Sequence, residues 1–199
     1  DVGMTTAFGY SGVALLHHVI QIYPDVPIYF IDTGYHFDET LEFAERLQRL
    51  WRLNLHIHRP KLSKEQLRHK TGDPPYRENP DLCCYFNKVV PYLEFSSNHP
   101  VWLSAVRRDQ AVTRSAISLC EVDGYKTLKV HPFYKWKSKK ILAYIRKHNL
   151  PYNPLHDQNY FSIGCWPCTR PVSSRTHARH GRWPGLDKVE CGLNNYRGE

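Results

Sequence analysis

Helical and strand-like patterns of apolar residues follow one another along most of the chain. Residues 13–22 carry apolar side chains at the spacing of a helix packed on a sheet, and residues 39–53 form a longer amphipathic pattern. Between them, Pro27 to Asp32 is a short apolar run that predicts a buried strand. Further strands are predicted at residues 55–58, at 101–105 and from Leu128, with a last helix at 137–148. The alternation predicts a doubly wound, mostly parallel α/β sheet, whose ligands bind at the carboxyl ends of the strands.

The chain becomes irregular after the last predicted helix. Pro151 to Gln158 holds too many helix and strand breakers for a regular element. The tail that follows is cationic and poor in apolar residues, but Trp183 and the glycines beside it interrupt its charge. Most charge runs are only solvated faces, but this pattern favours a loop that closes over an anionic ligand. We therefore expect a nucleotide-binding α/β domain at residues 1–170 and a mobile C-terminal segment at residues 171–199.

The composition fits one domain that meets an anionic partner. With 199 residues and 41% hydrophobic content, the chain can bury one substantial core, and no apolar run approaches the ~18 residues of a membrane span. The formal net charge of +8 favours a nucleotide, a sulfate or phosphate ester, or RNA, and charge alone does not choose among them. No signal-like apolar segment lies near the start, so a reducing, cytoplasmic location is expected.

A small turn rich in glycine and serine precedes the first predicted helix. The segment from Thr6 to Gly12 could cradle a phosphate at the helix N-terminus. Glycines at strand-to-helix turns equally serve tight geometry, so this turn alone does not decide between the two interpretations.

Five of the six cysteines fall into an adjacent pair, a Cys-x-x-Cys and a lone tail position, namely Cys83 and Cys84, Cys165 and Cys168, and Cys191. The Cys-x-x-Cys spacing suits metal or iron-sulfur ligation. Adjacent cysteines, with α-carbons ~3.8 Å apart, reach separate irons of a cluster more easily than two corners of one tetrahedral zinc ion. The spacing therefore favours an iron-sulfur cluster and leaves structural zinc, disulfides and buried thiols open. The sixth cysteine, Cys120, is expected to be a small buried apolar residue.

Six motifs, in order over nearly the whole chain, resemble the assimilatory adenylyl-sulfate/phosphoadenylyl-sulfate reductase family. They are Cys83-Cys84 with Lys88, Arg107 to Gln110, Pro151 to Asp157, Gly164 to Arg170, Gly181 to Trp183, and Glu190 to Leu193. The resemblance implies an adenine-nucleotide alpha hydrolase-like fold, the PP-loop or PAPS reductase fold. It also implies reduction of adenosine 5′-phosphosulfate (APS), or of its 3′-phosphorylated form (PAPS), to sulfite and an adenosine nucleotide. Thioredoxin or a glutaredoxin-like dithiol would be the electron donor.

Family members with both cysteine pairs hold a [4Fe-4S] cluster and usually prefer APS. The resemblance therefore implies such a cluster on Cys83, Cys84, Cys165 and Cys168. It makes Cys191 the catalytic nucleophile, which takes the sulfite group as an S-sulfocysteine. The dithiol donor then releases the sulfite from Cys191. Neither a nucleic acid nor a membrane is expected as a partner, and assembly into a homo-oligomer is left open.

The anionic oxygens around the substrate's sulfur repel a thiolate, so cations must screen them. The candidates are Lys88, Arg107, Arg108, Arg179 and Arg182. Arginine suits this task because its fork of N–H groups can contact a phosphate or sulfate at two points. By resemblance, further contacts to the nucleotide would come from Thr6, Ser11 and Gly12 at the phosphate and from Asp32, Thr33 and Gly34 at the adenosine.

Three features depart from the family pattern. Asn194 stands where the family has a histidine after the catalytic motif, and Asn87 stands where an arginine often precedes the lysine. The first change bears on proton transfer beside the thiolate, and the second on the balance between APS and PAPS. The chain also begins at its first predicted strand, without the helical segment usual in relatives, as expected of a shortened form or a fragment.

Two other classes of protein share part of this pattern. An iron-sulfur enzyme that thiolates tRNA would combine a phosphate loop with positive charge, but its fuller Ser-Gly-Gly-x-Asp-Ser loop is not matched by residues 8–12. A zinc-binding nucleic-acid module would leave Cys191 without a role.

Overall fold

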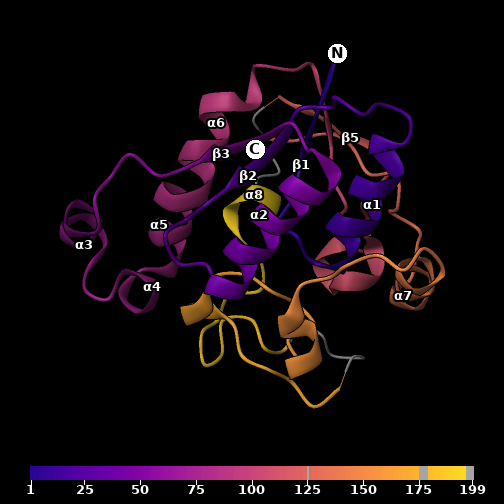
Figure 1. Ribbon diagram of the computed structural model, residues 1–199. Coiled ribbons are helices and arrows are strands. Elements are labelled where there is room, and N and C mark those ends of the chain that lie inside the picture. The colour runs from indigo at the N-terminus through magenta and orange to yellow at the C-terminus, as the bar shows by residue number, and fades with distance from the viewer. Residues whose placement is uncertain (125, 175–178, 196–199) are drawn as a thin grey trace.

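A six-stranded sheet in the order β3-β2-β1-β4-β6-β5 forms the centre of the protein (Figure 1). The computed structural model describes residues 1–124, 126–174 and 179–195. Its strands are β1 Val2–Thr5, β2 Ile28–Ile31, β3 Leu55–His58, β4 Val101–Leu103, β5 Cys120–Val122 and β6 Leu128–Val130. Neighbouring strands are parallel, except that β5 runs antiparallel to β6 at the edge. The predicted doubly wound, mostly parallel sheet is confirmed.

Helices cover both faces of the sheet. The elements that pack on one face are α1 Tyr10–Ile20, α2 Asp38–Trp51 and α7 Ser138–Lys147, and α6 Val90–Ser96 packs on the other. Alternation along β2 explains the two layers, because Phe30 joins the first cluster while its neighbour Tyr29 stacks on Phe95 of α6. The short helices are α3 Lys64–Thr71, α4 Pro75–Glu78, α5 Pro80–Cys84, the π-helix η1 Tyr85–Val89, and α8 Gly192–Asn195.

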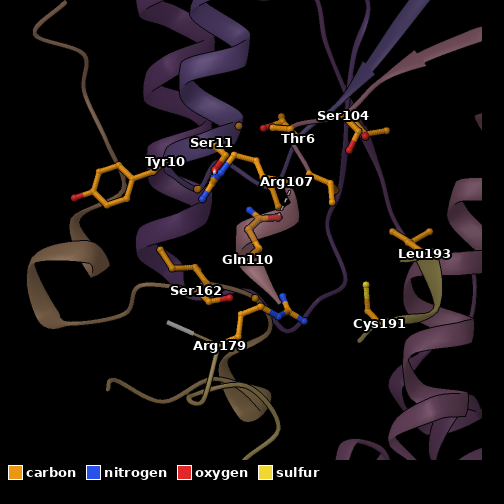
Figure 2. Close-up of a pocket in the computed structure, with 18 of the residues that line it drawn as sticks. Thr6, Tyr10, Ser11, Ser104, Arg107, Gln110, Ser162, Arg179, Cys191 and Leu193 are labelled. Atoms are coloured by element: carbon orange, nitrogen blue, oxygen red, sulfur yellow. Dashed lines mark hydrogen bonds between the residues drawn. The ribbon is translucent and has the colours of Figure 1, made fainter. Parts of the chain in front are cut away.

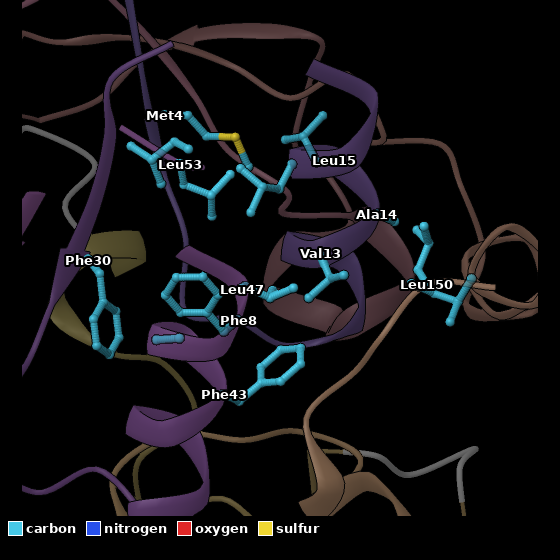
Figure 3. Close-up of a cluster of buried hydrophobic side chains, with 14 of the residues drawn as sticks. Met4, Phe8, Val13, Ala14, Leu15, Phe30, Phe43, Leu47, Leu53 and Leu150 are labelled. Atoms are coloured by element: carbon cyan, nitrogen blue, oxygen red, sulfur yellow. The ribbon is translucent and has the colours of Figure 1, made fainter. Parts of the chain in front are cut away.

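The larger hydrophobic core fixes the turn between β1 and α1 (Figure 3). Phe8 lies in this turn, is fully buried, and meets the rings of Phe30 and Phe43 edge-on at 5.2 Å and 6.4 Å. Its φ of 53° is a left-handed conformation that costs a phenylalanine roughly 1–3 kcal/mol. Burial of the ring contributes about 1.5–3 kcal/mol, enough to offset that strain. The core therefore holds the turn in a shape that its backbone would not choose alone.

Several sequence expectations are corrected by the structure. Helix α1 ends at Ile20, and Ile22 beyond it is 81% exposed. Cys120 is exposed, contrary to the expected burial, because β5 is an edge strand whose Val122 is also 67% exposed. The helices between β3 and β4 were not predicted, because prolines divide them into segments too short to show a helical period. Over the described parts of the chain, no helix is long and apolar enough to cross a membrane.

The described part of the tail packs beneath the carboxyl ends of the strands (Figure 1). Thr169 forms a β-bridge with Arg182, and the Arg170 N–H donates to the Gly181 carbonyl at 2.8 Å. The Trp183 N–H donates to the Cys168 carbonyl at 2.9 Å. Hydrogen bonds therefore cross the expected boundary between residues 170 and 171, and mobility of the tail stays a prediction.

Candidate active site

A cavity of about 390 Å³ lies at the carboxyl ends of β1 and β4. Thr5 and Thr6 line it at the end of β1, and Ser104 to Arg107 line it after β4. The chain order reverses here, since β1 has β2 on one side and β4 on the other. Open α/β sheets bind ligands at such switch points, and this volume suits a ligand of nucleotide size.

The turn from Thr6 to Gly12 forms one wall of the cavity (Figure 2). Gly12 allows a close approach, because a Cβ there would lie 2.6 Å from Thr6 Oγ1. Thr6 Oγ1 also accepts the Phe8 N–H at 3.1 Å, which fixes the turn. Gly9 occupies the N-cap position of α1 and has no side chain to cap the first-turn N–H groups. These donors can serve an anion, as the phosphate interpretation of the sequence requires.

Arg107 is anchored beside this turn by protein groups. Its guanidinium donates to Ser11 Oγ, to Ser138 Oγ at 2.9 Å and to the Asp109 carboxylate at 2.9 Å. The side chain is only 5% exposed. Arg107 therefore positions Ser11 against the N-terminus of α7. Arg108, the other arginine predicted to screen the substrate's oxygens, lies outside the cavity lining. It stacks on Tyr134 and donates to the Ile117 carbonyl.

The cavity is strongly cationic. Among the described residues that line it, six are lysine or arginine and two are acidic. The cations are Lys88, Arg107, Arg114, Lys129, Arg179 and Arg182. The Arg182 guanidinium lies close to Gly164, where a Cβ would collide with it, and within the described residues its buried Nε has no hydrogen-bond partner. A buried donor of this kind on a cavity wall suits an anionic ligand oxygen.

Cys191 lines the cavity on the side away from the turn, across from Tyr10 and Ser11 in the view of Figure 2. Burial works to raise the pKa of its thiol, but the nearby cations Lys88, Arg114 and Arg182 outweigh burial and hold that pKa below its ordinary value. A lowered pKa increases the fraction of thiolate, which is the nucleophilic form. The site therefore pairs an activated sulfur with a positive field.

Glu190, the residue before Cys191, is held by a buried set of donors. Arg114 forms a bidentate pair with it, Nε to Oε1 at 2.7 Å and Nη2 to Oε2 at 2.7 Å. Thr113 Oγ1 donates to Oε1 at 2.9 Å, and Arg179 Nη2 donates to Oε2 at 3.0 Å. Burial alone would raise the pKa of Glu190, but the hydrogen bonds and charge of Arg114 lower it. The carboxylate thus ties the tail to the loop that follows β4.

The four paired cysteines line a second, smaller cavity. They are Cys83, Cys84, Cys165 and Cys168, all buried and without disulfide bonds. Burial raises the pKa of Cys83 to about 12 and that of Cys168 to about 11, opposite to the shift at Cys191. Within residues 1–124, 126–174 and 179–195, no group of three or more histidine, cysteine or acidic side chains is placed to hold one metal ion.

Lys88 and Trp183 line both cavities and so connect them. Lys88 lies on η1, the π-helix that begins directly after Cys84. Burial disfavours its charged form, but negative charge at Cys165, Cys84 and Cys191 outweighs burial and raises its pKa. Lys88 is therefore a partly buried ammonium held between the paired thiols and Cys191. Its location fits the expectation that it acts beside the cysteine pair.

The segment Asp32 to Gly34 lies against the cysteines, and none of its three residues lines the large cavity. Thr33 Oγ1 lies 3.3 Å from Cys165 Sγ, and the Asp32 carboxylate accepts from Arg59 Nε at 3.0 Å. Residues on either side, Ile31 and His36, do line the cavity. The expected contact with adenosine stays a prediction for this segment.

The lining residues that were given no role in the sequence interpretation include Arg114, Lys129 and Glu190. Glu190 appeared only as part of a motif, and Arg114 lies seven residues beyond Arg107 in the same loop. The position of this loop at a strand's carboxyl end was the one signal that pointed to Arg114. The side chain of Asn194 lies outside the described residues. Asn87 is buried, and its amide donates to the Cys83 carbonyl at 3.0 Å.

Comparison with known proteins agrees with this geometry. Residues 1–171 match the family model of the phosphoadenosine phosphosulfate reductase domain. Adenosine 5′-phosphosulfate reductase 1 of Bacillus subtilis is 43% identical over 190 residues, covering 94% of this chain and 82% of the relative. Adenosine 5′-phosphosulfate reductase of Bacillus velezensis is 41% identical over the same shares.

A solved structure extends the similarity to the fold. The phosphoadenylyl-sulfate (PAPS) reductase of Candida auris, in a phosphate complex, superimposes with a TM-score of 0.73 at 31% identity, covering 86% of this chain and 83% of that one. The family model spans most of the chain, and the relatives match it nearly end to end. The chain therefore belongs to the phosphoadenosine phosphosulfate reductase family.

Proposed function

We propose that this protein reduces APS to sulfite and AMP, with Cys191 as the nucleophile and an external dithiol protein as the reductant. The observation that carries the proposal is the placement of Cys191, with its lowered pKa, across a cationic cavity from the glycine- and serine-rich turn. The turn suits the nucleotide phosphate, and the cations suit the sulfate. The names of the relatives supply the substrate class.

The first step is attack of the Cys191 thiolate on the substrate's sulfur. A bond forms between Cys191 Sγ and this sulfur, and the bond between sulfur and the bridging phosphate oxygen breaks, so that AMP leaves with the electron pair. Lys88 and Arg182 line the cavity near Cys191, where they can screen the sulfate oxygens during the approach. The product on the protein is an S-sulfocysteine at residue 191.

The second step regenerates the thiolate. A donor thiolate attacks Cys191 Sγ and expels sulfite with the electron pair, leaving a mixed disulfide. The donor's second thiol then resolves this disulfide, and Cys191 returns to the thiolate. The two electrons that reduce the sulfur come from the donor's two thiols, so this chain needs one redox cysteine only. A thioredoxin or glutaredoxin-like protein of a reducing, cytoplasmic compartment meets this requirement.

A [4Fe-4S] cluster is the cofactor that the second cavity fits best. Four buried thiols, an adjacent pair and a Cys-x-x-Cys, line that cavity. A single zinc ion requires all its sulfurs about 2.3 Å from one point, whereas a cluster binds each cysteine through its own iron. Cys83, Cys84, Cys165 and Cys168 would hold the cluster. When bound, it would supply fixed negative charge from its sulfurs and thiolates beside Lys88.

Turnover tests the proposed reaction directly. Purified protein with reduced thioredoxin is expected to convert APS into equal amounts of sulfite and AMP, with PAPS as a poorer substrate. The similarity to a PAPS reductase makes PAPS the second arm of the assay. Turnover of PAPS in preference to APS would reverse the assignment of substrate, and turnover of neither would reject the function.

The cofactor is tested separately by composition. Anaerobically purified protein is expected to be brown and to contain iron and sulfide, and Cys83→Ser should lose the visible absorbance. A colourless protein that carries zinc would reject the cluster and favour a structural metal site.

A further inference from the structure

We infer that Asp109 is a positioning residue for the nucleotide's phosphate, because through Arg107 it sets the direction in which the Ser11 hydroxyl donates its hydrogen. Asp109 lines the cavity, yet the proposed reaction gives it no part. A carboxylate beside a site for an anion needs a physical reason, since like charges repel. The inference rests on the proposed function, which supplies the phosphate.

The Asp109 carboxylate holds Arg107 and the start of α7 together. Its Oδ1 accepts from Arg107 Nε at 2.9 Å. Its Oδ2 accepts from the Ser138 N–H at 2.6 Å and from the Ser138 hydroxyl at 3.0 Å. The residue before α7, Lys137, gives the helix no side-chain cap, so Asp109 caps it from another segment. All three partners of this carboxylate are hydrogen donors.

Arg107 extends this arrangement to Ser11 (Figure 2). Its Nη1 donates to Ser11 Oγ, its Nη2 donates to Ser138 Oγ at 2.9 Å, and its Nε also reaches the Trp136 carbonyl at 3.1 Å. A guanidinium is planar and rigid, so contacts that fix Nε and Nη2 also fix the direction of Nη1. The first turns of α1 and α7 are thereby joined through one arginine.

The two serines on Arg107 differ in where their own hydrogens go. The Ser138 hydroxyl donates to Asp109. The Ser11 oxygen accepts from a donor that is always charged, so its hydrogen must point away from Arg107. Among the described residues, none accepts that hydrogen. Ser11 lies in the first turn of α1 and lines the cavity, so a phosphate oxygen at this helix N-terminus can accept it.

Asp109→Asn tests this role because an amide cannot replace the carboxylate here. Its size is the same, but one of its two polar atoms is an NH₂ group. Since every partner of Asp109 donates, this NH₂ must face either Arg107 or the start of α7. One of these contacts is lost, and the guanidinium is no longer held against Ser11.

The first measurement compares AMP with adenosine by calorimetry. Asp109→Asn should raise the Kd for AMP about tenfold, the usual effect of one hydrogen bond to a charged group. The Kd for adenosine, which has no phosphate, should stay within about twofold. Removal of a negative charge alone would instead tighten AMP binding, so the sign separates positioning from simple repulsion.

The matched control is Asp25→Asn. Asp25 is an exposed carboxylate in the loop before β2, at the end of the strands opposite the cavity. This variant should change neither affinity. Unchanged or tighter AMP binding in Asp109→Asn would overturn the inference. Equal weakening of AMP and adenosine would also overturn it, because that result indicates a general loss of structure.

A double-mutant cycle tests whether Asp109 acts through Ser11. Ser11→Ala alone should raise the Kd for AMP, because the donated hydrogen is gone. In the Ser11→Ala background, Asp109→Asn should add less than about twofold. Residues that act independently would multiply their effects. Full multiplication of the two single effects would contradict a path from Asp109 to the phosphate through Ser11.

Single-turnover formation of the adduct on Cys191 separates this inference from the proposed function. In Asp109→Asn, the APS concentration that gives half the maximal rate should rise about tenfold. The maximal rate should stay within about threefold, because lost ground-state binding leaves the chemical step intact. A large fall in maximal rate with unchanged half-saturation would overturn the inference. If wild-type protein binds AMP but forms no adduct, the proposed reaction fails, and the AMP and adenosine affinities still decide the role of Asp109.

Discussion

The two walls of the cavity are built in different ways. The turn from Thr6 to Gly12 is local: one strand, one helix and one buried ring, Phe8, fix its shape. The facing wall joins segments far apart in the chain, with Lys88 from η1, Arg114 from the loop after β4, and Cys191 from the tail. One wall relies on backbone geometry, and the other relies on buried charge.

This difference indicates that one wall serves substrate binding and the other serves the chemical step. Backbone N–H groups at a helix N-terminus can hold a phosphate at small cost, because the fold already orients them. Buried cations cost desolvation, which anions nearby must offset. In the second wall these anions belong to the protein itself: Glu190 beside Arg114, and Cys191, whose thiol has a lowered pKa, beside Lys88. The following changes test whether the first wall governs affinity for the nucleotide and the second governs reactivity.

The largest effect is expected from Cys191→Ser. Removal of the nucleophile should lower turnover by ~10⁴-fold or more, while the affinity for AMP should stay within about threefold of wild type, because AMP lacks the sulfate. Turnover and AMP binding by calorimetry measure the two quantities. Cys120→Ser, at the exposed edge strand, is the control and should change neither. Turnover retained in Cys191→Ser would assign the chemistry to another residue.

Lys88→Ala should give the next largest effect. Lys88 lines both cavities, and its charge lowers the pKa of Cys191, so kcat/KM should fall by about 100-fold. Affinity for AMP should change little. Lys61→Ala is the matched control, since Lys61 is 78% exposed and pairs with Glu94 on the surface. An unchanged kcat/KM in Lys88→Ala would remove the proposed link between the cysteine cavity and the reaction.

Gly12→Ala should weaken AMP binding and leave the reactivity of Cys191 unchanged, the opposite of Lys88→Ala. Its Cβ would press on Thr6 Oγ1, so the turn must shift and the Kd for AMP should rise about tenfold. The rate of maleimide labelling at Cys191 should not change, because the second wall is untouched. Gly9→Ala is the comparison variant in the same turn. A Cβ at Gly9 meets nothing within 4 Å, so this variant should keep the wild-type melting temperature. Weaker AMP binding together with faster labelling would show that the two walls are coupled.

The smallest effect is expected in the pH dependence of stability. Burial opposes the lowered pKa of Glu190, but Arg114 brings that pKa below the ordinary value of 4.5. The stabilisation is therefore complete above about pH 4.5 and is lost as the pH falls through the lower folded pKa. The gap in melting temperature between wild type and Glu190→Gln should be full at pH 7 and should narrow below about pH 4.5. A gap that grows in acid would have the wrong sign.

The sequence predicted the first wall better than the second. Apolar periodicity and turn residues report local structure, so the strands β2, β3, β4 and β6, the helices α1, α2 and α7, and the turn itself were expected within a few residues. Motif resemblance predicted the family and pointed to Cys191. Family membership favours the reductase function over the tRNA-thiolating enzyme and the zinc-binding module. The pairing of Glu190 with Arg114 was not predicted, because a contact across 76 positions leaves no periodic signal.

Burial was the other quantity that the sequence left undetermined. Cys120 was expected to be buried from its residue type, but the edge position of β5 exposes it. The tail was expected to be a cationic loop, yet Trp183 and Glu190 within it are among the buried residues. Both outcomes depend on which strand lies at an edge and on which segment covers it, and these are properties of the assembled fold.

Intact mass spectrometry after incubation with APS, in the absence of any dithiol, tests directly whether Cys191 takes the sulfite group. One added SO₃ group per chain is expected, mapped to Cys191, with release of one equivalent of AMP and no adduct on Cys191→Ser. Release of sulfite without an adduct, or an adduct that persists in Cys191→Ser, would contradict it.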